Sequence, residues 1–77
     1  MPPLMNNPVQ LVHVQFNGLP LEIPTGTNIE QLLQLAEMRS RLVAVEVNGE
    51  LVPRAQHAQC CVAAGDLIEA VTLVGGG

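Results

Sequence analysis

The sequence of 77 residues contains no lysine, no tryptophan and no tyrosine, and it has a single phenylalanine. Without lysine, the chain has no ε-amine for a Schiff base, a phosphate clamp or isopeptide attachment. Its only strong cations are Arg39, Arg41 and Arg54, against seven acids, so the formal net charge is −4. Nucleic-acid binding needs a basic patch or stripe, which this composition cannot supply. We therefore expect no nucleic-acid partner.

The sequence also lacks an apolar run long enough to cross a membrane. Residues 1–8 hold three prolines and two asparagines, without the basic and apolar regions of a signal peptide. With 48% hydrophobic residues, a chain of this length can build one small core. We expect a flexible lead-in at 1–8, one domain over 9–74, a flexible tail at 75–77, and a cytoplasmic protein without a membrane partner.

Cysteine is scarce, and the two cysteines, Cys60 and Cys61, are adjacent. Adjacent cysteines in extended chain point to opposite faces and rarely pair, and two are too few for a disulfide scaffold or a zinc site. We expect one to be a small core residue and the other to lie at the surface. A redox or persulfide role is the alternative, and reduced thiols fit the cytoplasm.

Two stretches of the chain have the pattern of a β-hairpin. Apolar and polar residues alternate over 10–16, Asn17-Gly18 is typical of a tight turn, and 20–23 resumes the alternation until Pro24. Residues 43–47 alternate again, and Asn48-Gly49 leads into a short strand. A last strand is expected over 67–74.

A helix is expected between the two hairpins. Thr27 and Glu30 have the spacing of a capping box, and apolar residues then recur at helical spacing, which predicts a helix over 28–38. Arg39 and Arg41 near its C-terminus suit the helix dipole. Residues 54–59 are polar and could hold one turn of helix. A short extended piece is expected over 59–62.

This order of elements predicts an α+β fold. One helix can cover only one face of a sheet, so the first and last strands are most simply central, parallel neighbours joined across the helix. We predict the β-grasp arrangement of ubiquitin-like domains: a mixed four- to five-stranded sheet with one main helix packed on one face.

The chain has few groups that could carry catalysis. His13 and His57 have no neighbouring partner in the sequence that would mark a triad or a ligand set, and His13 is expected on the solvent side of its strand. The seven acids are dispersed, and Gly75–Gly77 precede no helix that could bind a phosphate. We expect no catalytic residue and no metal site.

The last strand and the tail are unusual together. Ile68 and Ala70 should face the helix, yet Val71 and Leu73 on the opposite phase are also apolar. We interpret Val71, Leu73 and Val74 as a docking surface for a partner, although barrel-like curvature could instead shield them.

Three glycines at the end of the chain would carry the Gly77 carboxylate on a thin tether, Gly75-Gly76, into a channel too narrow for side chains. A carboxylate must be activated before it reacts, most simply as an acyl-adenylate. The alternative is a frayed terminus without function.

Several motifs resemble one family. Residues 48–54 read Asn-Gly-Glu-Leu-Val-Pro-Arg, similar to the motif N-G-x-x-V-P-R of the thiamine-biosynthesis sulfur carriers, the ThiS family. Gly65-Asp66 before the last strand, Gly76-Gly77 at the end and the helical start at 28–33 also match, so the resemblance covers about residues 9–77. The lead-in and Cys60-Cys61, where aliphatic residues are usual, depart from the pattern.

The resemblance implies a carrier that is not itself an enzyme and binds no cofactor. A ThiF-type enzyme would adenylate the Gly77 carboxylate with ATP, a desulfurase or rhodanese-type donor would convert it to a thiocarboxylate, and a thiazole synthase would take the sulfur. Three alternatives stay open. They are a molybdopterin-synthase-type sulfur carrier, a ubiquitin-like protein modifier, and a binding module with an inert tail.

Overall fold

The computed structural model of the chain describes residues 9–38 and 42–73. The expected lead-in at 1–8, Arg39, Arg41, Val74 and the tail at 75–77 lie outside the described residues. The elements, in chain order, are strands β1 (Leu11–Phe16) and β2 (Leu19–Pro24), helix α1 (Ile29–Leu35), strands β3 (Val43–Val47) and β4 (Glu50–Val52), the 3₁₀ turn η2 (Arg54–Gln56) and strand β5 (Leu67–Thr72).

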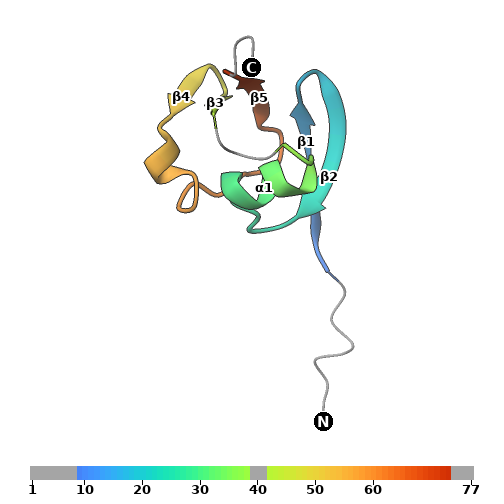
Figure 1. The fold of residues 1–77 in the computed structure, drawn as a ribbon. Coiled ribbons are helices and arrows are strands. Elements are labelled where there is room, and N and C mark those ends of the chain that lie inside the picture. Colours follow the sequence, from blue (N-terminus) through green and yellow to red (C-terminus); the bar gives the residue numbers. More distant parts are fainter. Residues whose placement is uncertain (1–8, 39–41, 74–77) are drawn as a thin grey trace.

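The described strands form one mixed sheet in the order β2-β1-β5-β3-β4. Strands β1 and β5 run parallel, with Gln15 beside Leu67, and the other neighbours are antiparallel. The helix α1 lies across one face of this sheet (Figure 1). The predicted α+β architecture, with the first and last strands as central parallel neighbours, is therefore confirmed.

Both predicted hairpin turns are present. Asn17 and Asn48 have φ values of 52° and 54°, and the glycines that follow have φ values of 84° and 86°. Two successive residues with positive φ are typical of a type I′ turn, whose twist matches that of the flanking strands. Asparagine tolerates this conformation, and glycine adopts it without a steric cost, which explains the Asn-Gly pairs.

The start of α1 differs from the prediction by one residue. Asn28, not Thr27, is the N-cap: its side chain accepts a hydrogen bond from the Gln31 backbone N–H at 2.7 Å, and the Gln31 side chain accepts one from the Asn28 N–H at 3.0 Å. Thr27 is buried instead, and its hydroxyl donates to the Pro24 carbonyl at 2.7 Å. The predicted capping box of Thr27 and Glu30 was wrong. The next pair along the chain, Asn28 and Gln31, has the same spacing and equally suitable side chains.

The helix α1 also ends earlier than the predicted residue 38. Glu37 has a φ of 61°, its N–H donates to the Gln34 carbonyl, and the Met38 N–H donates to the Leu33 carbonyl at 2.8 Å. These two bonds form a Schellman motif, which closes a helix with a left-handed residue. The prediction was wrong here because Glu37 has the left-handed conformation at the end of the helix, where glycine is the usual residue.

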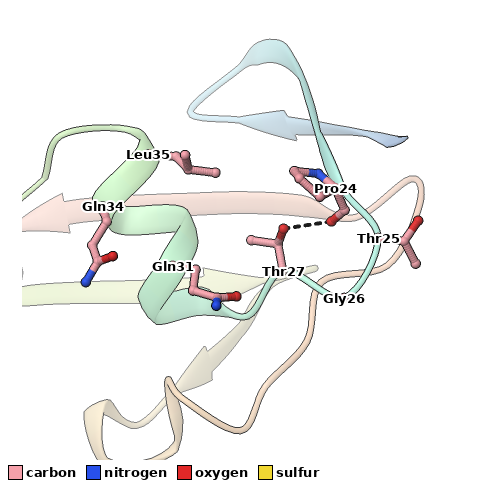
Figure 2. A pocket seen from close by; sticks show the side chains of 7 residues that line it. All are labelled: Pro24, Thr25, Gly26, Thr27, Gln31, Gln34 and Leu35. Carbon is pink, nitrogen blue, oxygen red and sulfur yellow. Dashed lines mark hydrogen bonds between the residues drawn. The ribbon is translucent and has the colours of Figure 1, made fainter. Parts of the chain in front are cut away.

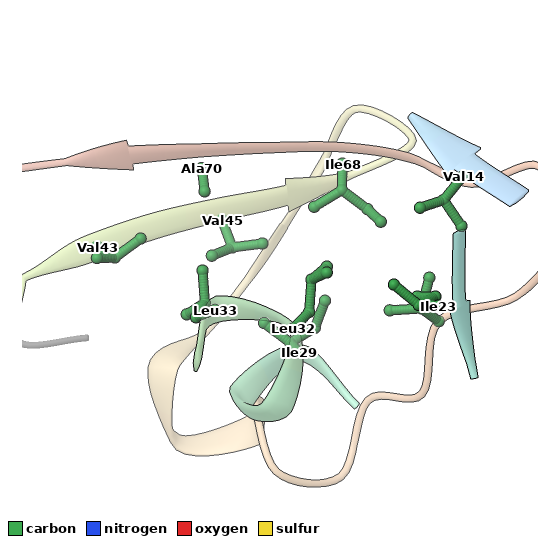
Figure 3. Packing of buried hydrophobic residues seen from close by; sticks show 10 residues of the cluster. Val14, Ile23, Ile29, Leu32, Leu33, Val43, Val45, Ile68 and Ala70 are labelled. Atoms are coloured by element: carbon green, nitrogen blue, oxygen red, sulfur yellow. The ribbon is translucent and has the colours of Figure 1, made fainter. Parts of the chain in front are cut away.

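The core lies between α1 and the sheet (Figure 3). Ile29, Leu32 and Leu33 of the helix are almost fully buried and point toward the central strands. The other buried apolar residues of this cluster are Val14, Ile23, Val43, Val45, Val62, Ile68 and Ala70. The helix is therefore held mainly by its apolar face, since seven residues are too few for a helix that is stable alone.

The segment between β4 and β5 agrees with the prediction in outline. The turn η2 supplies the expected helical turn, and Cys61 forms an isolated antiparallel bridge with Asn28. Cys60 is partly buried against the core and Cys61 is exposed, as predicted. Within the described ranges, no helix is long and apolar enough to span a bilayer.

Candidate functional site

Strand β5 is the element that leads to the C-terminal tail, and Asn17 fixes one of its edges. Strand β1 pairs with β5 only as far as Phe16 and Ile68. Beyond that point the Asn17 side chain takes over: its Oδ1 accepts from the Ala70 N–H at 2.8 Å, and its Nδ2 donates to the Ala70 carbonyl at 3.2 Å. One turn residue therefore extends the backbone pairing of β5 by one more step.

Asn48 of the second hairpin fixes the other edge of β5. Its N–H donates to the Leu67 carbonyl at 2.7 Å, and its Oδ1 accepts from the Leu67 N–H at 2.9 Å. Its Nδ2 donates to the Asp66 carboxylate at 3.0 Å, and the same carboxylate accepts from the Ala63 N–H. The start of β5 is thus tied to the turn that contains the Asn-Gly pair of the N-G-x-x-V-P-R motif.

The two phases of β5 lie in different surroundings. Ile68 and Ala70 are buried under α1, as predicted, whereas Val71 is 58% exposed and Leu73 is 57% exposed. The predicted positions of Val71 and Leu73 are confirmed, and the proposed shielding by curvature is not present at either residue. Val74, the third predicted docking residue, lies outside the described part of the chain.

Neighbouring strands add apolar groups on this open face of the sheet. Ala44 lies opposite Val71 in the register of β3 and β5, and Leu51 of β4 is 64% exposed on the same side. Leu67 precedes Val71 on the same phase of β5 and is half exposed. The sequence-based prediction did not include Ala44 and Leu51, because it considered the last strand without its neighbours. It left out Leu67 because it considered only the end of the last strand.

Neither histidine belongs to a catalytic arrangement. His13 is on the solvent side of its strand, as predicted, but it does have a partner: its Nε2 lies 2.7 Å from Glu22 across the hairpin, and both side chains are exposed. His57 is buried, and its Nε2 lies 3.1 Å from the Val52 carbonyl oxygen. The surroundings of both histidines are therefore structural: His57 is packed in the interior, and His13 contacts Glu22 at the surface.

An open pocket of about 540 Å³ lies between the end of β2 and α1 (Figure 2). Its lining residues are Pro24, Thr25, Gly26, Thr27, Gln31, Gln34 and Leu35. None of them is titratable, and the Thr27 hydroxyl and the Gln31 side chain are already engaged in local hydrogen bonds. In the described part of the chain no group of three or more potential metal ligands occurs.

The architecture and the site together define a class of protein. A mixed sheet with one helix on one face and the last strand at its centre is the β-grasp fold of ubiquitin-like domains. Its central last strand presents apolar side chains on the open face and leads directly toward a glycine tail.

Comparison with known proteins identifies the family within this class. The ThiS family model matches residues 14–77, so the chain belongs to the ThiS family. The sulfur carrier protein ThiS of Escherichia coli is 30% identical over 66 residues, which cover 86% of this chain and 100% of that protein. This Escherichia coli relative is named as a carrier protein.

A solved structure and a longer relative support the same placement. The crystal structure of a thiamine biosynthesis protein, ThiS, from Geobacter metallireducens superposes with a TM-score of 0.75 at 29% identity, covering 86% of this chain and 100% of that chain. A thiazole synthase of Paramagnetospirillum magneticum is 41% identical over 62 residues. Those residues are 80% of this chain but only 19% of that protein, so this chain spans about a fifth of its length.

Proposed function

We propose that this chain is the sulfur carrier for the thiazole moiety of thiamine and that the Gly77 carboxylate is its reactive group. The main support for the proposal is the position of β5 in a member of the ThiS family. This strand is central in the sheet, carries exposed apolar side chains on the open face, and is followed in the sequence by the glycine triplet 75–77. No group in the described residues offers a competing catalytic arrangement.

The chemistry follows from the low reactivity of a carboxylate. In the first step, a Gly77 carboxylate oxygen attacks the α-phosphorus of ATP on a ThiF-type partner, and pyrophosphate leaves. The terminal sulfur of a donor persulfide, formed by a desulfurase or a rhodanese-type protein, then bonds to the acyl carbon as AMP leaves. A thiol cleaves the resulting sulfur–sulfur bond, which yields the thiocarboxylate and a disulfide.

Thiazole synthase is the proposed acceptor of this sulfur. The name of the Paramagnetospirillum magneticum relative supports this, because a segment similar to this chain occurs within a protein named thiazole synthase. A carrier and an enzyme that share one chain are held at a high effective concentration, which suits a delivery step between them. In the present chain, the same delivery would require docking of separate proteins.

The glycine tail suits this delivery on physical grounds. Three extended residues span roughly 10 Å. Because glycine has no Cβ atom, such a segment fits a channel that is too narrow for residues with side chains. A Cβ next to the acyl carbon would also hinder the approach of a sulfur nucleophile. We therefore assign Gly75 and Gly76 as the tether, and Val71, Leu73 and Val74 as part of the surface that docks on partner enzymes.

Intact-mass spectrometry tests the proposal directly. The chain is incubated with its ThiF-type enzyme, ATP and a persulfide donor, and its mass should rise by the difference between sulfur and oxygen. The matched control is a chain that lacks Gly76-Gly77, which should keep its fold and show no change in mass. An unchanged mass of the full chain, with partners that modify another ThiS protein, would contradict the proposal.

A further inference from the structure

Two glutamates face each other on the open side of the sheet. The register of β3 and β5 places Glu46 directly opposite Glu69, and both side chains are exposed. Directly opposite residues have Cβ atoms about 4.5–5.5 Å apart, and like charges at this position destabilise a sheet. The isolated domain therefore gains nothing from keeping two carboxylates there.

Apolar side chains lie around this acidic pair. Leu51 is opposite Glu46 on β4, and Ala44 and Val71 form the next pair along β3 and β5. Leu67 lies on the same phase of β5, two residues before Glu69. Charge at the centre and apolar groups at the sides are thus combined in one surface, which we call the acidic-centred face and define as Ala44, Glu46, Leu51, Leu67, Glu69 and Val71.

In the described part of the chain, no cation lies paired with either of these two glutamates. Among residues 9–38 and 42–73, neither Glu46 nor Glu69 forms an ion pair or a side-chain hydrogen bond. Arg54 lines a small pocket with Glu30 and Leu33, on the helix side of the sheet. Because the whole chain carries a formal net charge of −4, a partner with a positive surface would also be attracted over a longer range.

We infer that the acidic-centred face docks on the enzyme that activates Gly77, with an arginine of that enzyme placed between Glu46 and Glu69 and apolar side chains around it. Arginine fits better than lysine, because its planar guanidinium offers five donors and can bond two carboxylates at once. The inference rests on the proposed function and adds the chemistry of the docking partner. Docking here would place β5, the strand that precedes the tail in the sequence, against the enzyme.

Carrier-dependent release of pyrophosphate by the adenylating enzyme tests this assignment. The double variant E46Q/E69Q keeps the shape of both side chains and removes their charge. Its KM as carrier should rise at least about tenfold, because the arginine loses charged hydrogen-bond partners, while kcat stays within about twofold. Its melting temperature should equal or exceed that of the wild type, since a like-charge pair is removed.

The control is Glu50→Gln, which removes one negative charge on the other side of the sheet, next to Leu51 in sequence. Its KM should stay within about twofold of the wild type. An equal KM for E46Q/E69Q and the wild type would overturn the inference while the proposed function stands. An equally large effect of Glu50→Gln would overturn it too, because only net charge would then matter.

Two further outcomes separate the alternatives. Dissociation of a wild-type dimer by E46Q/E69Q in sedimentation velocity would assign the face to self-association, and an effect on thiazole synthase binding alone would assign it to that enzyme. Either result overturns the inference. Failure of the wild-type chain to be adenylated at all would instead reject the proposed function itself.

Discussion

The two faces of the sheet differ in what covers them, although the same strands build both. On the helix side, Val45 and Ile68 are 0% and 1% exposed, and they pack against α1. On the open side, Val71 and Leu51 are exposed by 58% and 64%. Both faces carry apolar residues, so hydrophobic composition alone does not decide which residues stabilise the fold.

The difference separates stability from recognition along a single strand. Burial of apolar surface stabilises a fold only where another part of the chain removes it from water. Ile68 and Ala70 of β5 are covered by other parts of the chain, whereas Val71 on the opposite face can be removed from water only in a complex. Substitutions one or three positions apart on β5 lie on opposite faces and should therefore affect different properties, which gives a direct way to test the comparison.

The largest effect is expected for Ile68→Ala on the helix side. The substitution leaves a cavity under α1, and the free energy of unfolding should fall by about 3 kcal/mol, as is usual for a fully buried isoleucine. Urea denaturation followed by circular dichroism measures it. Val71→Ala on the opposite phase is the matched control and should change the free energy by less than about 0.5 kcal/mol. Equal losses for both variants would remove the distinction between the faces.

A smaller effect is expected where β5 is held in register. Asn17→Gly keeps the positive φ of the turn but removes both side-chain bonds to Ala70, so the free energy of unfolding should fall by about 1–2 kcal/mol. Hydrogen exchange at the Ala70 amide should accelerate more than exchange at Val45. Unchanged protection of Ala70 would show that the Asn17 side chain does not hold this strand.

Much of the fold could be predicted from the sequence, because each element has a local pattern. The Asn-Gly turns, the alternation of residues 10–16 and 43–47 and the position of the helix between two hairpins were enough to place β1 beside β5. The ends of α1 were not predictable in the same way. Two overlapping capping pairs compete at its start, and Glu37 adopts a conformation at its end that a glycine would have indicated.

Substitution of the N-cap residue of α1 should reduce the free energy of unfolding by an intermediate amount. Asn28→Ala removes the N-cap bond to Gln31, and the free energy of unfolding should fall by about 1 kcal/mol. Glu30→Ala is the matched control, because the rejected capping box would need that side chain. Chemical denaturation of both variants measures the free energy of unfolding. A larger decrease for Glu30→Ala than for Asn28→Ala would indicate that Thr27 and Glu30 form the capping box.

The candidate site was only partly predictable. The apolar phase of β5 is visible in the alternation of residues 67–73, and the tail is visible as a glycine triplet. The acidic-centred face is not, because the pairing of Glu46 with Glu69 depends on the register between β3 and β5. These strands are separated by a long connection, and no local pattern fixes how they align.

The smallest effect on stability, and the most informative one for function, is expected for Val71→Ser. Val71 is exposed, so the free energy of unfolding should change by less than about 0.5 kcal/mol. If the open face docks on the adenylating enzyme, the loss of apolar contact should raise the KM of the carrier about threefold to tenfold. Leu11→Ser is the control, since Leu11 is also half exposed on this face but lies on β1, away from the end of β5. Similar KM values for Val71→Ser and the wild type would mean that apolar exposure on this face does not mark the docking surface.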